Sequence, residues 1–187
     1  MMALVIGLVG KIASGKGVVS DHLVKAYGGK VYRFSDVLRE LLLKLDKPNT
    51  RENLQALGLH LRQIFGDSVL ADVLKRQIHA DKSNLIIVDG VRYWNEVDMV
   101  RSFKNSLLIS ITAPPEVRFK RSLGRGTRGE SNISFEQFRR NEENPTEKVI
   151  DEIAVHADIK IENLGTREDL LKNLDTVLKP KLAKIKK

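Results

Sequence analysis

A glycine-rich motif near the amino terminus constrains the fold of this chain more than any other feature. The residues Gly10-Lys11-Ile12-Ala13-Ser14-Gly15-Lys16 satisfy the pattern G-x-x-x-x-G-K. They follow an apolar run, residues 4–8, and precede an amphipathic stretch, residues 18–25. A strand, a glycine loop and a helix in this order aim backbone N–H groups and a helix N-terminus at phosphate oxygens, while the lysine supplies positive charge. We therefore expect this loop to bind the phosphate chain of a nucleotide.

One position departs from the usual motif. Gly17 stands directly after Lys16, where a Ser or Thr hydroxyl usually contacts Mg²⁺, and Val18 follows it. Mg²⁺ gives up its water reluctantly, so phosphate oxygens, water and one distant carboxylate are sufficient to hold it. We expect Gly17 and Val18 to belong to the nucleotide site, and the metal ligand to come from another part of the chain.

The rest of the chain predicts an α/β fold. Short β-branched runs alternate with stretches of helical period, which is typical of strands and crossover helices around a parallel sheet. This pattern predicts one α/β domain over residues 1–187, and the glycine loop resembles that of P-loop proteins, which implies a three-layer fold with strand order 2-3-1-4-5. The five expected strands are residues 4–8, 30–34, 84–89, 106–112 and 158–162. A helical insert is expected near 36–79 and a short lid near 121–140.

The positive charge of the chain is concentrated in two segments. Of the net charge of +8, seven Lys or Arg against two Glu lie in residues 118–140, and five Lys lie in residues 179–187. Nucleic acid is a partner for such charge, but few aromatic residues interleave with it, and single strands are usually held by stacking as well. The chain has no cysteine, which excludes disulfides and thiolate metal sites. We expect a cytoplasmic protein that uses neither nucleic acid nor a membrane.

The segment after the second strand resembles nucleoside monophosphate kinases. Ser35-Asp36-Val37-Leu38-Arg39 is similar to their Gly-Asp-x-Leu-Arg, in which the arginine holds the phosphate of the acceptor. A guanidinium suits that task because it grips phosphate through a fork of hydrogen bonds. The resemblance implies acceptor contacts for Asp36 and Arg39. The alternative is a surface helix with an ion pair between positions i and i+3.

The end of the third strand resembles adenylate kinases. Asp89-Gly90-Val91-Arg92 is similar to their Asp-Gly-x-x-Arg with one residue fewer, which implies a water-mediated Mg²⁺ contact for Asp89 and an acceptor contact for Arg92. A plain turn is the alternative. In the insert, Arg51, Gln55 and Arg62 share one helical face opposite the leucines. Arg62 is a candidate acceptor ligand there, and a solvated face is the alternative reading.

The basic segment resembles the lid of adenylate kinases. Arg121-Ser122-Leu123-Gly124-Arg125 is similar to the start of that lid, which implies ATP contacts for Arg121 and Arg125. Arg140 resembles an arginine that closes over the transferring phosphoryl group. Phosphoryl transfer needs positioned positive charge more than covalent chemistry, so Lys16, Arg92, Arg125 and Arg140 are the candidate catalytic residues. A solvated basic face is the alternative for Arg121 and Arg125, and for Arg139 or Arg140, and Arg118, Lys120 and Arg128 suit the same task.

Across most of its length the chain is similar to archaeal proteins that resemble adenylate kinases and dephospho-coenzyme A kinases. Their shared features include Ala113-Pro114-Pro115-Glu116 and Ala157-Asp158. The resemblance implies a kinase that uses ATP and Mg²⁺ to phosphorylate a small phosphate-bearing acceptor, a nucleoside monophosphate first. Two alternatives stay open: transfer to a sugar hydroxyl with Asp36 or Asp21 as base, and a nucleotide-dependent RNA-binding or regulatory protein. The oligomeric state stays open as well.

Overall fold

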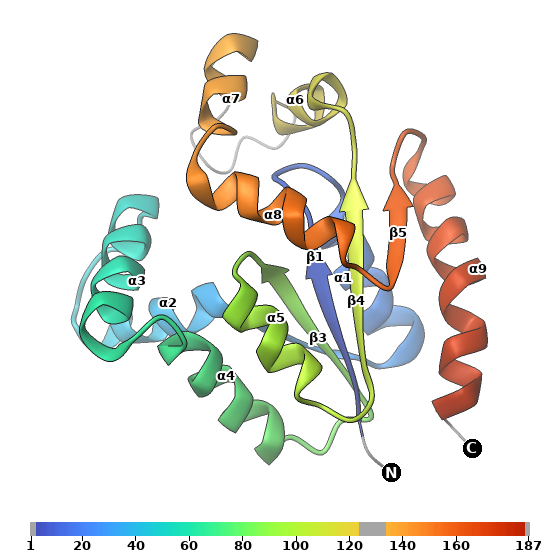
Figure 1. The fold of residues 1–187 in the computed structure, drawn as a ribbon, viewed down its shortest axis with the longest axis horizontal. Coiled ribbons are helices and arrows are strands. Elements are labelled where there is room, and N and C mark those ends of the chain that lie inside the picture. The colour runs from blue at the N-terminus through green and yellow to red at the C-terminus, as the bar shows by residue number, and fades with distance from the viewer. Residues whose placement is uncertain (1–2, 124–133, 186–187) are drawn as a thin grey trace.

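The computed structural model describes residues 3–123 and 134–185 and is built around one parallel sheet (Figure 1). The strand order is β2-β3-β1-β4-β5, and every neighbouring pair is parallel. The sequence-based prediction of the fold and of the strand order is therefore confirmed. The strands are β1 (Leu4–Val9), β2 (Lys30–Arg33), β3 (Leu85–Val91), β4 (Ser106–Thr112) and β5 (Ile159–Glu162).

Helices connect successive strands and cover both faces of the sheet. Those before β4 are α1 (Lys16–Tyr27), α2 (Phe34–Lys44), α3 (Arg51–Phe65), α4 (Val69–Ala80) and α5 (Trp94–Arg101). Those after β4 are α6 (Pro115–Leu123), α7 (Phe135–Asn141), α8 (Pro145–Val155) and α9 (Arg167–Ile185). In Figure 1, α5 and α8 lie on the near side of the sheet and α1 on the far side.

The alternation of side chains along β1 builds two cores. Val5 and Val9 face a cluster that includes residues of α2, α4, α5 and α8. Leu4, Ile6 and Leu8 face the opposite cluster, which α1 and α9 complete. All six residues of β1 are buried, as expected of a central parallel strand covered on both faces.

Four of the five strands differ from the predicted ranges by one or two residues at an end, and two of these differences have a clear physical cause. Residue 34 was expected to end the second strand. In the structure Phe34 is instead the first residue of α2, and its side chain is buried in the core cluster that also contains Val5 and Val9. The third strand continues past Asp89 to Val91, because a shift of register pairs Leu8 with Asp89 and Val9 with Val91. Gly90 takes up the extra residue at φ +92°, a conformation that other residues rarely adopt.

The helical insert that was predicted from the sequence is present, and hydroxyl side chains cap two of the later helices. Helices α2 to α4 form the insert, over residues 34–80, and lie beside the β2 side of the sheet in Figure 1. Ser134 caps α7, accepting from the N–H of Gln137 at 3.1 Å, and Thr166 caps α9, accepting from the N–H of Asp169 at 3.2 Å. The centre of the predicted lid, with Arg125 and Arg128, lies outside the described residues.

Across residues 3–123 and 134–185, no helix combines the length and the hydrophobicity that crossing a bilayer requires.

Candidate functional site

The glycine loop between β1 and α1, residues 10–16, curls at the carboxyl end of the sheet. Gly10 has φ +151° and Gly15 has φ +113°. A Cβ atom at Gly10 would lie 2.2 Å from the carbonyl oxygen of Ile111, and one at Gly15 would lie 2.5 Å from Nδ2 of Asn163. Ala13 adopts φ 58°, which is uncommon for a residue with a side chain. The packing of the loop against β4 and the β5 end therefore requires glycine at both ends of the motif.

Two polar groups of the glycine loop turn inward. Nζ of Lys16 donates to the carbonyl oxygen of Gly10 and, at 3.0 Å, to that of Lys11, so the lysine lies across the loop. Ser14 is 1% exposed, and its Oγ has no hydrogen-bond partner among the described residues. A buried hydroxyl without a partner is costly, and an anion held in the loop would satisfy it. The loop therefore fits the phosphate chain of a nucleotide.

Arg121 and the segment after β5 lie against the glycine loop. Nδ2 of Asn163 donates to the carbonyl oxygen of Ser14 at 2.8 Å. Arg121 donates to the carbonyl oxygen and Oδ1 of Asn163, both at 3.3 Å, and to the carbonyl oxygen of Gly165 at 3.1 Å. The structure thus brings together Arg121, the glycine loop and the Asn163-Leu164-Gly165 segment.

Asp89, the candidate metal ligand, lies beside β1 just before the glycine loop. Its Oδ2 accepts from Nε of Arg33 at 3.1 Å. Within the described residues, no group of three or more His, Asp or Glu side chains could hold a metal ion. A Cβ atom at Gly17 would meet nothing within 4 Å, so the position that usually carries the hydroxyl ligand opens on free space. The donor set fits an Mg²⁺ ion held mainly by phosphates and water.

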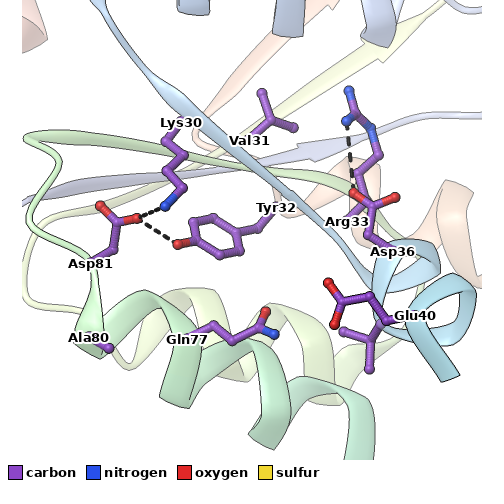
Figure 2. A pocket seen from close by; sticks show the side chains of 10 residues that line it. Lys30, Val31, Tyr32, Arg33, Asp36, Glu40, Gln77, Ala80 and Asp81 are labelled. Carbon is purple, nitrogen blue, oxygen red and sulfur yellow. Dashed lines mark hydrogen bonds and ion pairs between the residues drawn. The ribbon is translucent and has the colours of Figure 1, made fainter. Parts of the chain in front are cut away.

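The first group of acceptor candidates lies where β2 meets α2. Nη1 of Arg39 donates to Oδ1 of Asp36 and to Oγ of Ser35, and Arg33 approaches Asp36 at 4.0 Å. Asp36 and Arg33 also line a groove of about 450 Å³ between β2, α2 and α4, with Glu40 further along it (Figure 2). The predicted pair of Asp36 and Arg39 is therefore in contact and more than a third exposed.

The second group of acceptor candidates is gathered around Glu96. Nη2 of Arg62 lies 3.4 Å from Oε1 of Glu96, and its guanidinium stacks 4.6 Å from the ring of Tyr93. The N–H of Arg92 donates to Oε2 of Glu96 at 2.7 Å, while Nη1 of Arg92 donates to Glu147 of α8 at 2.8 Å. Glu96 therefore joins the guanidinium of Arg62 to the backbone of Arg92, while the guanidinium of Arg92 reaches α8. The side chain of Arg62 is only 18% exposed, so it does not lie on a solvated face.

Helices α6 to α8 enclose a second cavity, of about 240 Å³, next to the glycine loop. Arg118 and Arg139 line it, and both pair with the buried carboxylate of Glu142. Arg140, the predicted catalytic residue, instead points to Glu136 at 2.6 Å on the exposed side of α7. Adjacent helical residues point about 100° apart, so Arg139 faces the cavity and Arg140 does not. In this structure Arg139 therefore lines the cavity, and Arg140 points away from it.

Four residues of the site were not anticipated from the sequence: Arg33, Glu96, Glu147 and Asp151. Asp151 of α8 pairs with Lys11 of the glycine loop at 2.7 Å. Each contributes an ion pair between elements that are distant in the chain, and no local motif signals such a pair. Glu96 alone carried a local signal, for a helix cap and not for its ion pair. It stands three residues after Tyr93, which precedes α5, and a glutamate at this position often accepts a hydrogen bond from the backbone N–H of the capping residue.

Known proteins resemble this chain over most of its length. A family model for the AAA domain matches residues 9–139. A UPF0200 protein from Methanosarcina mazei is 34% identical over 179 residues, 95% of each chain. A UPF0200 protein from Sulfurisphaera tokodaii is 29% identical over 175 residues, 94% of this chain and 96% of that one.

Solved structures share the fold at lower identity. The shikimate kinase from Acinetobacter baumannii, solved in complex with shikimate, is 18% identical, with a TM-score of 0.58 over 96% of both chains. TT1252 from Thermus thermophilus is 22% identical, with a TM-score of 0.56 over 96% of this chain and 98% of that one. These two structures support a kinase-like P-loop fold. The AAA-domain match over residues 9–139 and the 34% identity over 95% of each chain show that the chain belongs to the UPF0200 proteins and carries a domain of the AAA type.

Proposed function

We propose that the chain is an ATP-dependent phosphotransferase that acts on a small phosphate-bearing acceptor, a nucleoside monophosphate in the first place. The observation that carries the proposal is that Arg62, through its guanidinium, and Arg92, through its backbone N–H, both contact Glu96 beside the carboxyl end of β3, while the guanidinium of Arg92 contacts Glu147. Arg62 lies in α3 of the insert, and Arg92 directly follows β3. Strand β3 is a neighbour of β1, and β1 leads into the glycine loop. We infer that these two guanidinium groups hold the phosphate of an acceptor and that the glycine loop holds the phosphates of the donor.

In the proposed reaction an oxygen of the acceptor's phosphate forms a bond to the γ-phosphorus as the bond from phosphorus to the bridging β-oxygen breaks, which releases ADP. The loop amides and Lys16 hold the donor, and Arg121 contacts its nucleoside side. Arg39, Arg62 and Arg92 orient the acceptor, whose phosphate oxygen is already a nucleophile near neutral pH and needs no strong base.

Positive charge around the transferring group completes the proposed site. Bound Mg²⁺ would neutralise charge on the β- and γ-phosphates, with Asp89 holding it through water. From the lid side, Arg118 and Arg139 lie at the cavity beside the glycine loop, and Arg125 stays a candidate from the sequence. Charge placed where it develops in the transition state stabilises that state at little cost in reorganisation.

A second candidate function is transfer to a hydroxyl group. Asp36 favours it, because this carboxylate lines the groove beside the carboxyl end of β2, where it could accept the proton of a sugar or ring hydroxyl. A nucleotide-dependent RNA-binding protein is the third candidate, and it rests on the basic segment and the lysine-rich tail.

One panel of assays separates the three candidates. The protein is incubated with ATP, Mg²⁺ and, in turn, each nucleoside monophosphate, each deoxynucleoside monophosphate, dephospho-coenzyme A and shikimate, and ADP formation is measured. Lys16→Ala is the control for contaminating kinases. Turnover of one or more nucleoside monophosphates supports the proposal. Turnover only of a hydroxyl acceptor supports the second candidate, and salt-sensitive RNA binding without any turnover defeats the kinase proposal.

A further inference from the structure

Glu96 is a buried carboxylate that joins the two sides of the proposed acceptor site. It is 3% exposed and lies in the first turn of α5. Oε2 accepts from the N–H groups of Arg92 at 2.7 Å and Tyr93 at 3.3 Å, at the end of β3. Oε1 faces Nη2 of Arg62, which α3 carries. One side chain therefore contacts the insert, the strand end and the start of α5.

Capping of α5 explains only half of this arrangement. A glutamate in the first turn of a helix often accepts from the backbone N–H groups that precede the helix, and Oε2 does so here. That role is usually filled at the surface, whereas burying a carboxylate costs several kcal/mol unless a charge and hydrogen bonds compensate. Oε1 and its approach to Arg62, 34 positions earlier in the chain, need a separate explanation.

Arg62 is held in place but keeps unused hydrogen-bonding capacity. Nη1 donates to the carbonyl oxygen of Gly58 at 3.2 Å, and the ring of Tyr93 supports the guanidinium plane. Its Nε is buried without a hydrogen-bond partner among the described residues, and so is Oε2 of Glu147, the partner of Arg92. A buried N–H donor without an acceptor is costly, and an anionic ligand would supply the acceptor.

We propose that Glu96 is a positioning residue for the acceptor: it fixes Arg62 of the insert relative to the strand end that carries Arg92, so that both guanidinium groups address one phosphate. This inference rests on the proposed function. The charged and titratable groups that face Glu96 are Arg62 from α3 and Arg92 and Tyr93 from the strand end, while Glu147 of α8 lies behind Arg92. Burial raises the pKa of Glu96 to about 7, against the lowering effect of the two arginines.

The test replaces Glu96 with an isosteric amide. In Glu96→Gln the side-chain oxygen still accepts from the N–H of Arg92, but the amide NH₂ meets the NH₂ of Arg62, and two donors cannot bond to each other. We expect the KM for the acceptor to rise about tenfold, because one charge-assisted hydrogen bond is lost. We expect kcat at saturating acceptor and the KM for ATP to change less than about twofold. A helix-capping role alone would leave the KM for the acceptor unchanged.

Asp158→Asn is the matched control. Asp158 also accepts one backbone N–H, from Leu108 at 2.7 Å, and one guanidinium, from Arg101 at 2.6 Å. It lies just before β5, at the amino end of the sheet, away from the glycine loop. We expect this variant to lose stability while the KM for the acceptor stays at the wild-type value. Melting temperatures of both variants separate a loss of folded protein from a loss of affinity.

A double variant tests whether Glu96 acts through Arg62. If it does, Glu96→Gln adds nothing to the KM of Arg62→Gln, whereas independent effects multiply. If Glu96→Gln does not fold, Arg62→Lys probes the same contact, because lysine keeps the charge but lacks the fork, and we expect a similar rise in KM.

The outcomes separate this inference from the proposed function. Wild-type turnover that Lys16→Ala abolishes, together with an unchanged acceptor KM in Glu96→Gln and in Arg62→Lys, overturns the positioning role alone. Effects that multiply in the double variant overturn it too. Absence of turnover with every acceptor overturns the proposed function and this inference with it. A raised KM in Glu96→Gln, a normal KM in Asp158→Asn and no further effect in the double variant support the inference.

Discussion

Gly15→Ala should destabilise the protein far more than a glycine-to-alanine change two residues away. Gly15 has φ +113°, and a backbone of this kind costs about 1–3 kcal/mol once a side chain is present. The new Cβ atom would lie 2.5 Å from Nδ2 of Asn163, which must then move and give up its hydrogen bond to the carbonyl oxygen of Ser14. Leaving that buried oxygen without a donor costs about 1–3 kcal/mol more. We expect the free energy of unfolding to fall by about 2–6 kcal/mol in total.

Gly17→Ala is the matched control for this change. Gly17 is the second residue of α1, and a Cβ atom there meets nothing within 4 Å. Alanine loses less conformational entropy in a helix than glycine does, so this variant should gain about 0.5–1 kcal/mol or stay neutral.

Equilibrium unfolding in urea measures both changes, with the fluorescence of the single tryptophan, Trp94, as the signal. The slope of the transition must match that of the wild type for the comparison to hold. A Gly15→Ala variant within about 0.5 kcal/mol of the wild type, or a Gly17→Ala variant destabilised as strongly as Gly15→Ala, would refute the account of the glycine loop given above.

Four further predictions concern the proposed reaction and the pH dependence of stability. Lys16→Ala should abolish ADP formation while the melting temperature stays near the wild-type value, since Lys16 belongs to neither apolar core and is expected to meet phosphate; normal turnover would remove the loop from the site. Asp89→Asn should raise the Mg²⁺ concentration needed for half-maximal activity, and Gly17→Ser, which places a hydroxyl in open space, should lower it; superimposed Mg²⁺ titrations would contradict both assignments. Arg39→Ala should raise the KM for the acceptor and leave that for ATP unchanged, and a shift in the KM for ATP alone would reassign the residue. Finally, burial raises the pKa of Glu96 from 4.5 to about 7 in the folded protein. The stability that its protonated form contributes is therefore present below about pH 4.5 and is lost as the pH rises to about 7. The loss in the free energy of unfolding is up to about 3 kcal/mol. Carboxylates elsewhere have lowered pKa values, so their contribution to stability changes with pH in the opposite direction. The measurement is therefore the difference in the free energy of unfolding between wild type and Glu96→Gln from about pH 4.5 to about pH 8. A difference that does not change with pH would contradict the prediction.

The sheet was predictable from the sequence because its signals are local. Each strand is a short β-branched run, and the glycine loop fixes which strand lies at the centre and which end carries the site. The failure at Phe34 has a physical cause. An aromatic residue shortly after Val31 and Tyr32 continues the composition of a strand. In the folded chain, however, the side chain of Phe34 is buried in the core as the first residue of α2, and this packing overrides the local preference for a strand.

The site was predictable only in part, since its contacts join residues that are far apart in the chain. The basic segment indicated arginines at the lid, but composition does not distinguish Arg139, which lines the cavity, from Arg140, which points away from it. Likewise, the sequence places Arg62 on a polar helical face and gives no sign that Glu96 will bury it. Only the folded chain brings such residues together.

The carboxylate partners have a consequence for how the proposed site would bind anions. Several of its cations meet an acidic group in the structure: Lys11 with Asp151, Arg33 with Asp89, Arg39 with Asp36, Arg62 with Glu96, Arg92 with Glu147, and Arg118 with Glu142. A guanidinium that is already paired with a carboxylate gains little binding energy from another weakly basic anion, since one ion pair replaces another of similar strength. A phosphate that bridges two such groups gains more, because it offers several oxygens and more negative charge than a single carboxylate. We therefore expect the site to favour doubly charged phosphate esters over carboxylates of similar size. The pair of Arg92 and Glu147 tests this directly: Glu147→Gln removes the competing charge and should lower the KM for a nucleoside monophosphate by several fold, whereas an unchanged or raised KM would show that Glu147 does not compete with the acceptor.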